Sequence, residues 1–484
     1  MTLIQDQIQT RNLIDGQWTD ADGGATFAVT NPATDSHIAD VPDGGEDDAR
    51  RAIDAAHGAF EPWAGLAASD RCEKIARLAE LMHRDADRLA TLMTTEQGKP
   101  LGESRGEIAY AASFLEWAAG EGRRLYGDIV PASAADKRIL VLRQPVGVAA
   151  IITPWNFPAA MITRKLGPAL ACGCTTVIKP AEDTPLSALA IGELALEAGI
   201  PPGVVNILTG DPRKIGKAIF SDSRVRKLSF TGSTEVGRTL MEQSAENLLR
   251  LSMELGGHAP FLVFDDADVD KAVSAAVACK FRNAGQTCIC ANRFYVQNGV
   301  YDAFMKGFAE AIESLEVGEG LQDGVNIGPL INDGAVEKVE THVADANDKG
   351  ATVRVGGHKV RVDGLADRFY APTLLDGMTS EMLCATEETF GPVAPVARFA
   401  KEDEAIAAAN DSPFGLAAYF FTGNASRLIR VAEALEYGIV GANDAAPSTA
   451  QAPFGGVKHS GFGREGGRYV MDEYTNTKYV SWGL

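Results

Sequence analysis

Long apolar runs, a surplus of basic residues and a dense set of cysteines are all missing from this chain of 484 residues. No apolar run reaches about 18 residues, so we expect no segment that spans a membrane. Met1–Thr10 has no basic start and no apolar centre, which argues against a secretory signal. Seven cysteines, an odd number in so long a chain, do not make a disulfide scaffold. These absences predict a protein of the reducing cytoplasm.

Positive charge is also in deficit. Lysine and arginine number 45 against 65 aspartate and glutamate residues, and the formal net charge is −20. An acidic surface repels phosphate groups, so neither nucleic acid nor an anionic membrane is an expected partner. An anionic small substrate would need a local group of arginine or lysine side chains.

Apolar content is ordinary for a globular protein, at 45% hydrophobic residues. Four apolar runs of strand length begin 21 to 29 residues apart, at Val146–Thr153, Thr175–Ile178, Val204–Leu208 and Val225–Phe230. Helical segments such as Leu186–Ala198 lie between them. This spacing is typical of βαβ units, and continuous apolar strands indicate a parallel sheet covered on both faces. The sequence therefore predicts a doubly wound, nucleotide-binding domain.

The remaining segments predict further elements. Helices are expected at Asp47–Phe60, Ser69–Gln97, Asp268–Arg282 and Tyr301–Leu315, and strands at Pro260–Phe264 and Phe294–Val296. The alternation after Glu254 predicts a second α/β domain. Residues 129–143 and 469–484 have strand-like content but no core of their own, so we expect them to pair with another subunit.

Two glycine-rich patterns resemble nucleotide-binding motifs, but we interpret neither as such a motif. Gly461–Gly466 matches G-x-G-x-x-G, but no strand precedes it and too little chain follows for a βαβ unit, so we interpret it as a turn. Gly232–Thr239 resembles a P-loop with arginine in place of the lysine. Free N–H groups at that helix start would suit a phosphate, while an ordinary helix cap by Ser233 explains the pattern equally well.

Cys288 is the strongest candidate for a reactive residue. It follows Gly285-Gln286-Thr287 in a loop after a predicted helix, where a nucleophile can be exposed and form a thiolate in electropositive surroundings. Glu254 follows a strand-like stretch, which places a carboxylate at the edge of the sheet where α/β active sites lie. The pairs Cys172/Cys174 and Cys288/Cys290 have C-x-C spacing and no matching histidines, so we predict no metal site.

Six motifs occur together and in order: Pro154–Pro158, Lys179-Pro180, Phe230–Ser233, Glu254–Gly257, Gly285–Cys288 and Glu388–Pro392. Each is weak alone, but the ordered set resembles the NAD(P)-dependent aldehyde dehydrogenase superfamily over essentially the whole chain. The stretches 280–293 and 452–456 are most similar to its succinate-semialdehyde dehydrogenase subgroup.

The resemblance implies a three-part α/β fold. Residues 1–124 and 145–253 form a doubly wound, parallel-sheet NAD-binding domain, and residues 254–450 form a second α/β catalytic domain. Residues 125–144 and 451–484 form a small β element for oligomerisation. The family implies a homodimer or homotetramer.

The resemblance also implies a mechanism. Cys288 attacks the aldehyde carbon, the Asn156 amide and the Cys288 N–H stabilise the oxyanion, and a thioester remains after hydride transfer. Glu254 is the general base that activates water, which requires a pKa raised by burial. A general base favours hydrolysis to the free acid over acyl transfer to coenzyme A.

The implied cofactor is NAD or NADP. Its expected contacts are Thr153, Pro154, Trp155, Lys179, Glu182, Gly232, Ser233, Leu255, Glu388 and Phe390. Lys179 and Glu182 are implied to hold the adenosine ribose, and Glu388 with Phe390 the nicotinamide ribose. The Glu182 carboxylate can accept a hydrogen bond from a 2′-hydroxyl but repels a 2′-phosphate, so we predict a preference for NAD.

The implied substrate is a short aldehyde with a remote anionic group, with succinate semialdehyde favoured. Arg164 and Arg282 match the subgroup's carboxylate-binding arginines, and Ser448 matches a serine that assists them. Two guanidinium groups suit a planar anion. Residues 443–449 depart from the subgroup's loop, which keeps glutarate semialdehyde and sulfolactaldehyde open as alternatives.

Three other interpretations remain at the sequence level. Cys290 could be a packed thiol or a redox partner of Cys288, although a C-x-C ring would be strained. A cysteine hydrolase would need His258 or His459 beside Cys288. A non-catalytic structural protein on the same fold would be expected to lack Cys288 or Glu254, and both are present.

Overall fold

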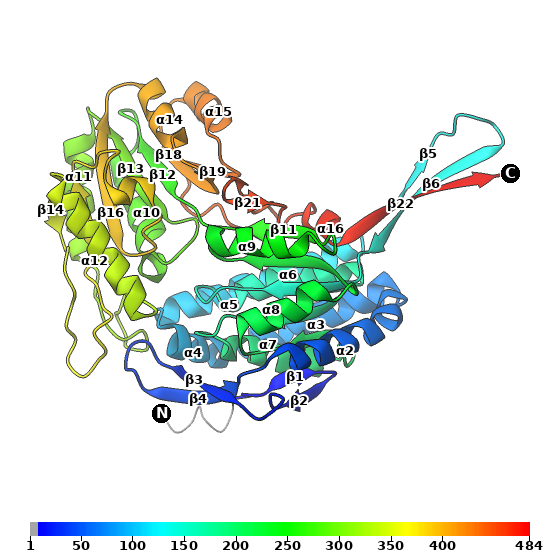
Figure 1. Ribbon diagram of the computed structural model, residues 1–484. Helices are drawn as coiled ribbons and strands as arrows, with labels where there is room; N and C mark the ends of the chain where they lie inside the picture. Colours follow the sequence, from blue (N-terminus) through cyan, green and yellow to red (C-terminus); the bar gives the residue numbers. More distant parts are fainter. Residues whose placement is uncertain (1–7) are drawn as a thin grey trace.

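Two open sheets, each packed against helices, make up the body of the protein, and a narrow three-stranded sheet projects from it (Figure 1). The computed structural model describes residues 8–484. Most of Met1–Thr10, the segment for which the sequence predicts no secretory signal, lies outside the described residues. No helix within residues 8–484 is both long and apolar enough to cross a membrane.

The first sheet has eight strands in the order β2-β1-β9-β8-β7-β10-β11-β21. These are β1 (Asn12–Ile14), β2 (Gln17–Thr19), β7 (Val148–Ile152), β8 (Thr175–Lys179), β9 (Val205–Ile207), β10 (Val225–Thr231), β11 (Arg250–Glu254) and β21 (Gly461–Phe462). The five central strands, β7 to β11, are parallel. The predicted doubly wound arrangement is confirmed.

Helices cover both faces of this sheet and bury its apolar strands. They are α2 (Glu46–Ala64), α3 (Ala68–Arg84), α4 (Ala86–Gln97), α5 (Leu101–Gly122), α6 (Ala160–Cys172), α7 (Leu186–Glu197), α8 (Pro212–Ser221) and α9 (Thr234–Ser244). The continuous helical pattern predicted over Ser69–Gln97 is divided between α3 and α4. The break is at Asp85, whose backbone (φ −99°, ψ 16°) leaves the α-helical region.

The order of the central strands creates a crevice at their carboxyl ends, between the loops that follow β7 and β10. From β7 the chain moves to β8 and β9 on one side, and then to β10 and β11 on the other. The loops after β7 and β10 therefore lead away from the same point in opposite directions. In doubly wound sheets, ligands bind at such a point.

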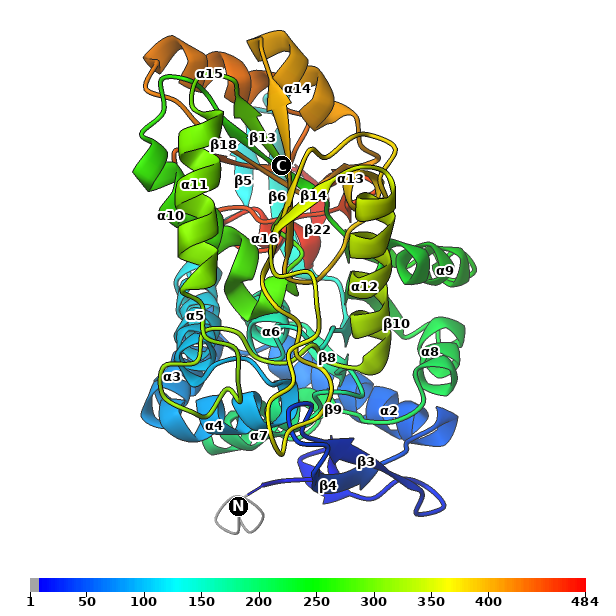
Figure 2. The same ribbon diagram turned by 90° about the vertical axis from the view of Figure 1, so that its left-hand side faces the viewer.

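The second sheet has seven strands in the order β14-β15-β16-β13-β12-β18-β19. These are β12 (Ala259–Val263), β13 (Ala291–Gln297), β14 (Thr352–Val355), β15 (Thr373–Asp376), β16 (Val393–Phe399), β18 (Ala417–Phe421) and β19 (Ile439–Ala442). Its helices are α10 (Val269–Phe281), α11 (Tyr301–Glu313), α12 (Asp333–Asp348), the short α13 (Leu383–Thr386), α14 (Glu402–Asn410) and α15 (Ala425–Ala434). Figure 2 shows this second unit above helices α2 to α8 of the first.

The projecting sheet consists of β5 (Asp128–Val130), β6 (Lys137–Pro145) and β22 (Thr475–Gly483), all antiparallel. Two large apolar side chains on β22 are exposed, Tyr479 by 62% and Trp482 by 59%. The chain just before β22 belongs to the body instead, because β21 pairs with β11 and the short helix α16 (Val470–Glu473) contacts α6.

Two short strand pairings complete the part of the structure described by residues 8–484. Strands β3 (Thr26–Thr30) and β4 (His37–Pro42) form a separate hairpin. Strand β17 (Phe414–Gly415) pairs with β20 (Val457–Lys458). Gly461–Gly466, interpreted from sequence as a turn, contributes only the two residues of β21 to a sheet.

Candidate active site

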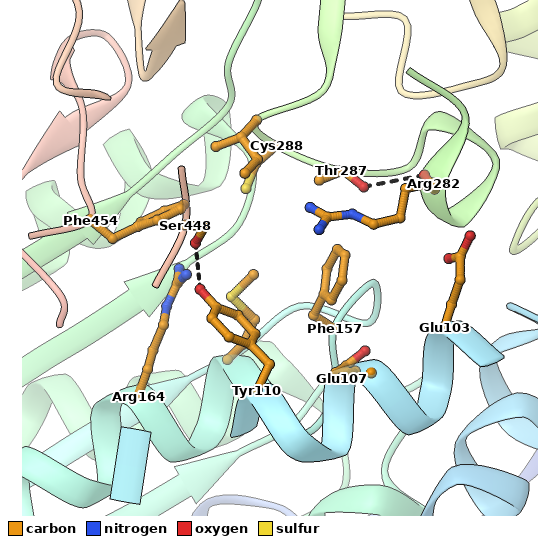
Figure 3. Close-up of a pocket in the computed structure, with 13 residues that line it drawn as sticks. Glu103, Glu107, Tyr110, Phe157, Arg164, Arg282, Thr287, Cys288, Ser448 and Phe454 are labelled. Carbon is orange, nitrogen blue, oxygen red and sulfur yellow. Dashed lines mark hydrogen bonds between the residues drawn. The ribbon is translucent and has the colours of Figure 1, made fainter. Parts of the chain in front are cut away.

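Two cavities meet at Cys288. The first, which we call the arginine cavity, has a volume of about 300 Å³ (Figure 3). Its lining residues are Glu103, Gly106, Glu107, Tyr110, Phe157, Met161, Arg164, Arg282, Thr287, Cys288, Ile289, Ser448 and Phe454. The second, the strand-end cavity, has a volume of about 350 Å³. Its lining residues are Pro154, Trp155, Asn156, Thr231, Gly232, Ser233, Leu255, Gly256, Cys288, Gly334, Ala335, Lys338, Glu388, Thr389 and Phe390.

A strained turn presents Cys288 to both cavities. Helix α10 ends at Phe281 and leads into the 3₁₀ turn η1 (Arg282–Gly285), where Asn283 and Ala284 have φ values of 52° and 54°. Non-glycine residues in this region store strain, and such strain is typical of functional sites. Gly285 is required at the end of the turn, because a Cβ there would lie 2.2 Å from the Gly391 carbonyl oxygen.

Cys288 does not have the electrostatic surroundings expected from the sequence. The side chain is half-buried, and burial raises the pKa of its thiol to about 12, although Arg164 opposes the shift. Glu388 and Glu254 raise it further. The expectation of an exposed, thiolate-stabilising site is therefore wrong for this conformation, since loss of water outweighs the nearby cations. Attack by Cys288 requires a group that removes the thiol proton.

Glu254 lies at the predicted strand end and is almost fully buried. It is the last residue of β11 and is 2% exposed. Neither carboxyl oxygen has a hydrogen-bond partner among residues 8–484. Burial, followed by the negative charge of Glu465, raises its pKa well above the ordinary value. The carboxyl group lines neither cavity and instead lies against Gly455, where an added Cβ would be 2.8 Å from Oε1.

Arg164 is buried and already paired. Its Nε forms an ion pair with Glu465, and the neighbouring Lys165 pairs with the other oxygen of the same carboxylate. The guanidinium carbon of Arg164 lies 4.2 Å from the centre of the Phe454 ring. Its Nη2 is buried without a hydrogen-bond partner among the described residues. Arg164 therefore faces the arginine cavity with much of its charge compensated.

Arg282 is the less constrained of the two arginines. Its side chain is exposed and makes no ion pair with any residue in 8–484. The guanidinium carbon lies 5.3 Å from the centre of the Phe157 ring. Across the cavity, Ser448 Oγ and Tyr110 Oη share a 2.5 Å hydrogen bond (Figure 3). The structure thus brings together the three residues predicted to bind the tail, Arg164, Arg282 and Ser448.

Several cavity residues were not found from the sequence. Tyr110, Glu103 and Glu107 lie on one face of α5, and Phe157 and Phe454 supply aromatic walls. No motif marked the face of α5, because its residues are spaced like those of any amphipathic helix. Phe157 and Phe454 lie within sequence motifs of the family, but those motifs predicted no role for either ring.

Asn156 is held rigidly beside the nucleophile turn. Its Nδ2 donates to the Gln286 carbonyl at 3.0 Å, and its own carbonyl accepts from Lys99 at 2.7 Å and from Asn283 at 3.0 Å. One of its two amide hydrogens is thus engaged with the loop that carries Cys288. The second is the donor available to a developing oxyanion.

The strand-end cavity collects the residues predicted to bind a nucleotide. Pro154 and Trp155 follow β7, and Gly232 and Ser233 follow β10. Ser233 lines the cavity and caps α9 by accepting a hydrogen bond from Val236 N, so the start of this helix borders the cavity. Such a terminus favours a phosphate group. Thr153 directly follows β7 and is buried, and it is not among the residues that line this cavity.

The opposite wall of this cavity comes from helix α12 and the loop before β16 in the second unit. Glu388 accepts from Gly257 N at 3.1 Å, and burial raises its pKa to about 7. Phe390 has a φ of 54° and its ring meets Trp155 edge-on with centroids 5.6 Å apart. Lys338, Gly334 and Ala335 on α12 also line the wall, and no sequence signal marked them.

Lys179 and Glu182 lie together at the end of β8. Lys179 Nζ donates to Glu182 Oε1 at 2.6 Å, and the glutamate side chain is 45% exposed. The predicted pair is therefore assembled, although neither residue lines the two cavities described above.

The residues of the rival interpretations lie elsewhere. His258 is buried, burial lowers its pKa well below the ordinary value, and it lines neither cavity. His459 is also absent from both linings. Cys290 is buried and accepts a hydrogen bond from Lys280 Nζ at 3.3 Å. No histidine among the described residues is placed to activate Cys288 as in a cysteine hydrolase.

Comparison with known proteins gives one consistent result. The profile described as the aldehyde dehydrogenase family matches residues 18–480. The chain is 56% identical over 472 residues to succinate-semialdehyde dehydrogenase [NADP(+)] GabD of Escherichia coli, which covers 98% of this chain and 97% of the relative. It is 52% identical over 476 residues to 3-sulfolactaldehyde dehydrogenase of Pseudomonas putida, which covers 98% and 97%. A solved structure described as an E. coli NADP-dependent enzyme matches with a TM-score of 0.97 at 54% identity, covering 100% of this chain and 99% of that one.

Proposed function

Because the chain belongs to the aldehyde dehydrogenase family, we propose that it oxidises a short aldehyde with a remote anionic group, and that this substrate is succinate semialdehyde, converted to succinate. One observation carries the proposal. Cys288 lies where a cavity with an unpaired arginine meets a cavity at the carboxyl ends of parallel strands. An anionic tail and a nucleotide can therefore approach the same sulfur from two sides.

The first step is attack of Cys288 Sγ on the aldehyde carbon. A thiol with a pKa of about 12 is protonated at neutral pH, so its proton passes to solvent at the cavity as the S–C bond forms and the carbonyl π electrons move onto oxygen. The oxyanion that forms would accept hydrogen bonds from the free Asn156 amide hydrogen and from Cys288 N. Donors held in advance cost no reorganisation during the reaction, and Gln286 and Lys99 hold Asn156 in this way.

The strand-end cavity fits NAD(P), the cofactor of this family. The helix start at α9 suits a pyrophosphate, and Gly256 leaves room beside Glu388, since a Cβ there would lie 3.0 Å from Oε2. Ser233 would contact the pyrophosphate, Glu388 and Phe390 the nicotinamide ribose, and Lys179 with Glu182 the adenosine ribose. When bound, the cofactor supplies the hydride acceptor.

Glu254 would then act on water. The acyl group left on Cys288 is a thioester, and its hydrolysis needs a base near the sulfur. Burial raises the pKa of the Glu254 carboxyl group, so its ionised form is a stronger base toward water than an ordinary carboxylate. Its two oxygens are free of hydrogen bonds among residues 8–484, so the side chain can turn toward Cys288 without breaking one.

Arg282 would bind the tail directly, with Ser448 and the buried Nη2 of Arg164 on the opposite side. A guanidinium group suits carboxylate and sulfonate oxygens alike. Glutarate semialdehyde and sulfolactaldehyde therefore stay as alternative substrates, which differ in chain length and in the chemistry of the anion.

Succinate semialdehyde and butanal test this proposal, because both have four carbons and butanal lacks the acid. We expect kcat/KM to fall by roughly a few hundred- to a few thousand-fold when the anion is lost. The measurement is the initial rate of reduced cofactor formation. Near-equal values for the two aldehydes would remove the semialdehyde assignment and leave a general aldehyde dehydrogenase.

For the cofactor we propose a preference for NAD, supported by the half-exposed carboxylate of Glu182. A 2′-phosphate would meet this negative charge. The E. coli relative has NADP(+) in its name, so the choice needs its own test. Glu182→Ser should move the ratio of kcat/KM for NAD over NADP toward NADP. An unchanged ratio would contradict the role of Glu182.

We also propose that the projecting sheet pairs with a second copy of the chain in a dimer or tetramer. The exposed Tyr479 and Trp482 on β22 support this, since large apolar side chains on an exposed edge strand favour association. Trp482→Asp should shift the mass measured by light scattering toward the monomer. An unchanged mass would place the interface elsewhere. The division into residues 1–124 with 145–253, 254–450, and 125–144 with 451–484 remains a proposal.

A further inference from the structure

The arginine cavity contains two carboxylates, although the substrate proposed for it is an anion. Glu103 and Glu107 both lie on α5 and line the cavity. Placing negative charge in an anion site reduces affinity unless the charge is compensated or has a use. The two residues differ in how their charges are compensated.

Glu107 is fully compensated. Its Oε2 accepts from Lys99 Nζ at 2.5 Å, and its Oε1 accepts from the backbone N–H groups of Ala159 and Ala160 at 3.0 and 3.2 Å. These contacts involve a buried cation and the start of α6. Glu107 is therefore part of the framework that supports the cavity.

Glu103 is not compensated in this way. Its Oε2 accepts one hydrogen bond, from Asn283 N at 2.8 Å, and no lysine or arginine of residues 8–484 forms an ion pair with it. Asn283 directly follows Arg282 in the chain. The carboxylate thus lies beside the segment that carries the unpaired cation of the cavity, and in Figure 3 the guanidinium lies between Cys288 and Glu103.

We infer that Glu103 restricts the substrate tail to a single negative charge. Arg282 attracts the tail anion, and the uncompensated Glu103 behind it repels a second negative charge on the same tail. The inference rests on the proposed function and narrows it. It assigns carboxylate and sulfonate tails to the substrate class and excludes phosphate-type dianions.

The charge of Glu103 at working pH supports this role. Burial raises its pKa to about 7, while Lys99, the Asn283 N–H group and Arg282 lower it and Glu107 raises it. At pH 8 the Glu103 carboxyl group is mostly ionised, so we expect the preference for singly charged over doubly charged tails to be near its maximum there.

Two aldehydes of the same shape isolate the charge. 3-Sulfopropanal and 3-phosphonopropanal have the same carbon chain and a tetrahedral anion, but at pH 8 the first carries one negative charge and the second close to two. We expect the purified wild-type enzyme to prefer the sulfonate in kcat/KM by at least about tenfold. Glu103→Gln keeps an acceptor oxygen for Asn283 N, and we expect it to reduce this preference by about tenfold.

The ratio within one variant cancels any change at Cys288 that affects both substrates. Glu103→Asp, which keeps the charge, should retain the preference and provides a second variant if the glutamine form folds poorly. Glu116→Gln changes an exposed carboxylate on the same helix and should leave the ratio unchanged.

The outcomes separate the two proposals. An unchanged sulfonate preference in Glu103→Gln, or no preference in the wild type, would overturn the role of Glu103 alone. Equal rates for succinate semialdehyde and butanal would overturn the anion site itself. A parallel loss with both tetrahedral substrates in Glu103→Gln would show that Glu103 only supports the turn.

Discussion

The two cavities that share Cys288 are built in different ways. The arginine cavity is lined by long charged and aromatic side chains, and much of its charge is held in pairs such as Arg164 with Glu465. The strand-end cavity is lined mostly by residues of loops that follow or precede strands, several of them small, together with the starts of helices α9 and α12. Selectivity for the tail therefore depends on a few replaceable side chains. Nucleotide binding depends on where strands and helices end, which a point substitution changes less.

The largest expected effect is at the residue common to both cavities. Cys288→Ala should lower aldehyde oxidation by about 10⁴-fold or more, because the linings of the two cavities contain no other cysteine that could form the acyl intermediate. Titration calorimetry should show that the nucleotide still binds, because the strand-end cavity keeps its other contacts. Cys384→Ala, which changes a buried cysteine outside both cavities, is the matched control. Substantial activity in Cys288→Ala would show that Cys288 is not the nucleophile at which the two cavities meet.

Glu254→Gln should separate the oxidation step from hydrolysis. We expect steady turnover to fall by about 10²- to 10³-fold, because the thioester loses its general base. A rapid first turnover should remain visible as a burst of reduced cofactor in stopped-flow absorbance. In the wild type, hydrolysis should accelerate as pH rises and the raised-pKa carboxyl group ionises, and the variant should lose this rise. Equal slowing of the first turnover would argue against a hydrolytic role.

Arg282→Met should affect only the arginine cavity. We expect kcat/KM for succinate semialdehyde to fall by about 10²-fold, with a much smaller change for butanal and for nucleotide affinity. Arg164→Met offers a contrast, because it removes one of two cations from the buried Glu465. Breaking a buried pair costs about 3–5 kcal/mol, so thermal unfolding should occur at a clearly lower temperature. If both variants lost only affinity for the anion, the distinction between a free and a paired arginine would be wrong.

Glu388→Gln should act mainly on the strand-end cavity and have the smallest effect. We expect the KM for the nucleotide to rise by about tenfold, because a charged acceptor becomes neutral. In the wild type, affinity should fall as pH drops through about 7, where Glu388 gains a proton and loses acceptor capacity. The variant should show no such dependence. A matching pH dependence in the variant would assign the titration to another group.

The sequence predicted individual strands and helices better than it predicted charge states. β7 and β10 were found because buried parallel strands are continuous apolar runs. The position of Glu254 at a strand end followed from the same pattern. The raised pKa of the Cys288 thiol was not predicted, because burial depends on which segments pack around a residue. The same holds for Tyr110 and Glu103, which face the cavity only because α5 packs beside the nucleophile turn.

Arg164 and Arg282 illustrate the difference between what the sequence determines and what only the tertiary structure decides. From the sequence both arginines were predicted, through the family resemblance, to bind the anionic tail. In the structure, Glu465 is brought from 301 positions further along the chain to pair with Arg164, whereas no carboxylate reaches Arg282 within ion-pair distance among residues 8–484. Spacing along the chain determined the parallel sheet, the helices and the order of the motifs, because hydrogen bonding and apolar burial repeat over short distances. Burial and long-range pairing set which charges remain free, and only the tertiary structure decided those.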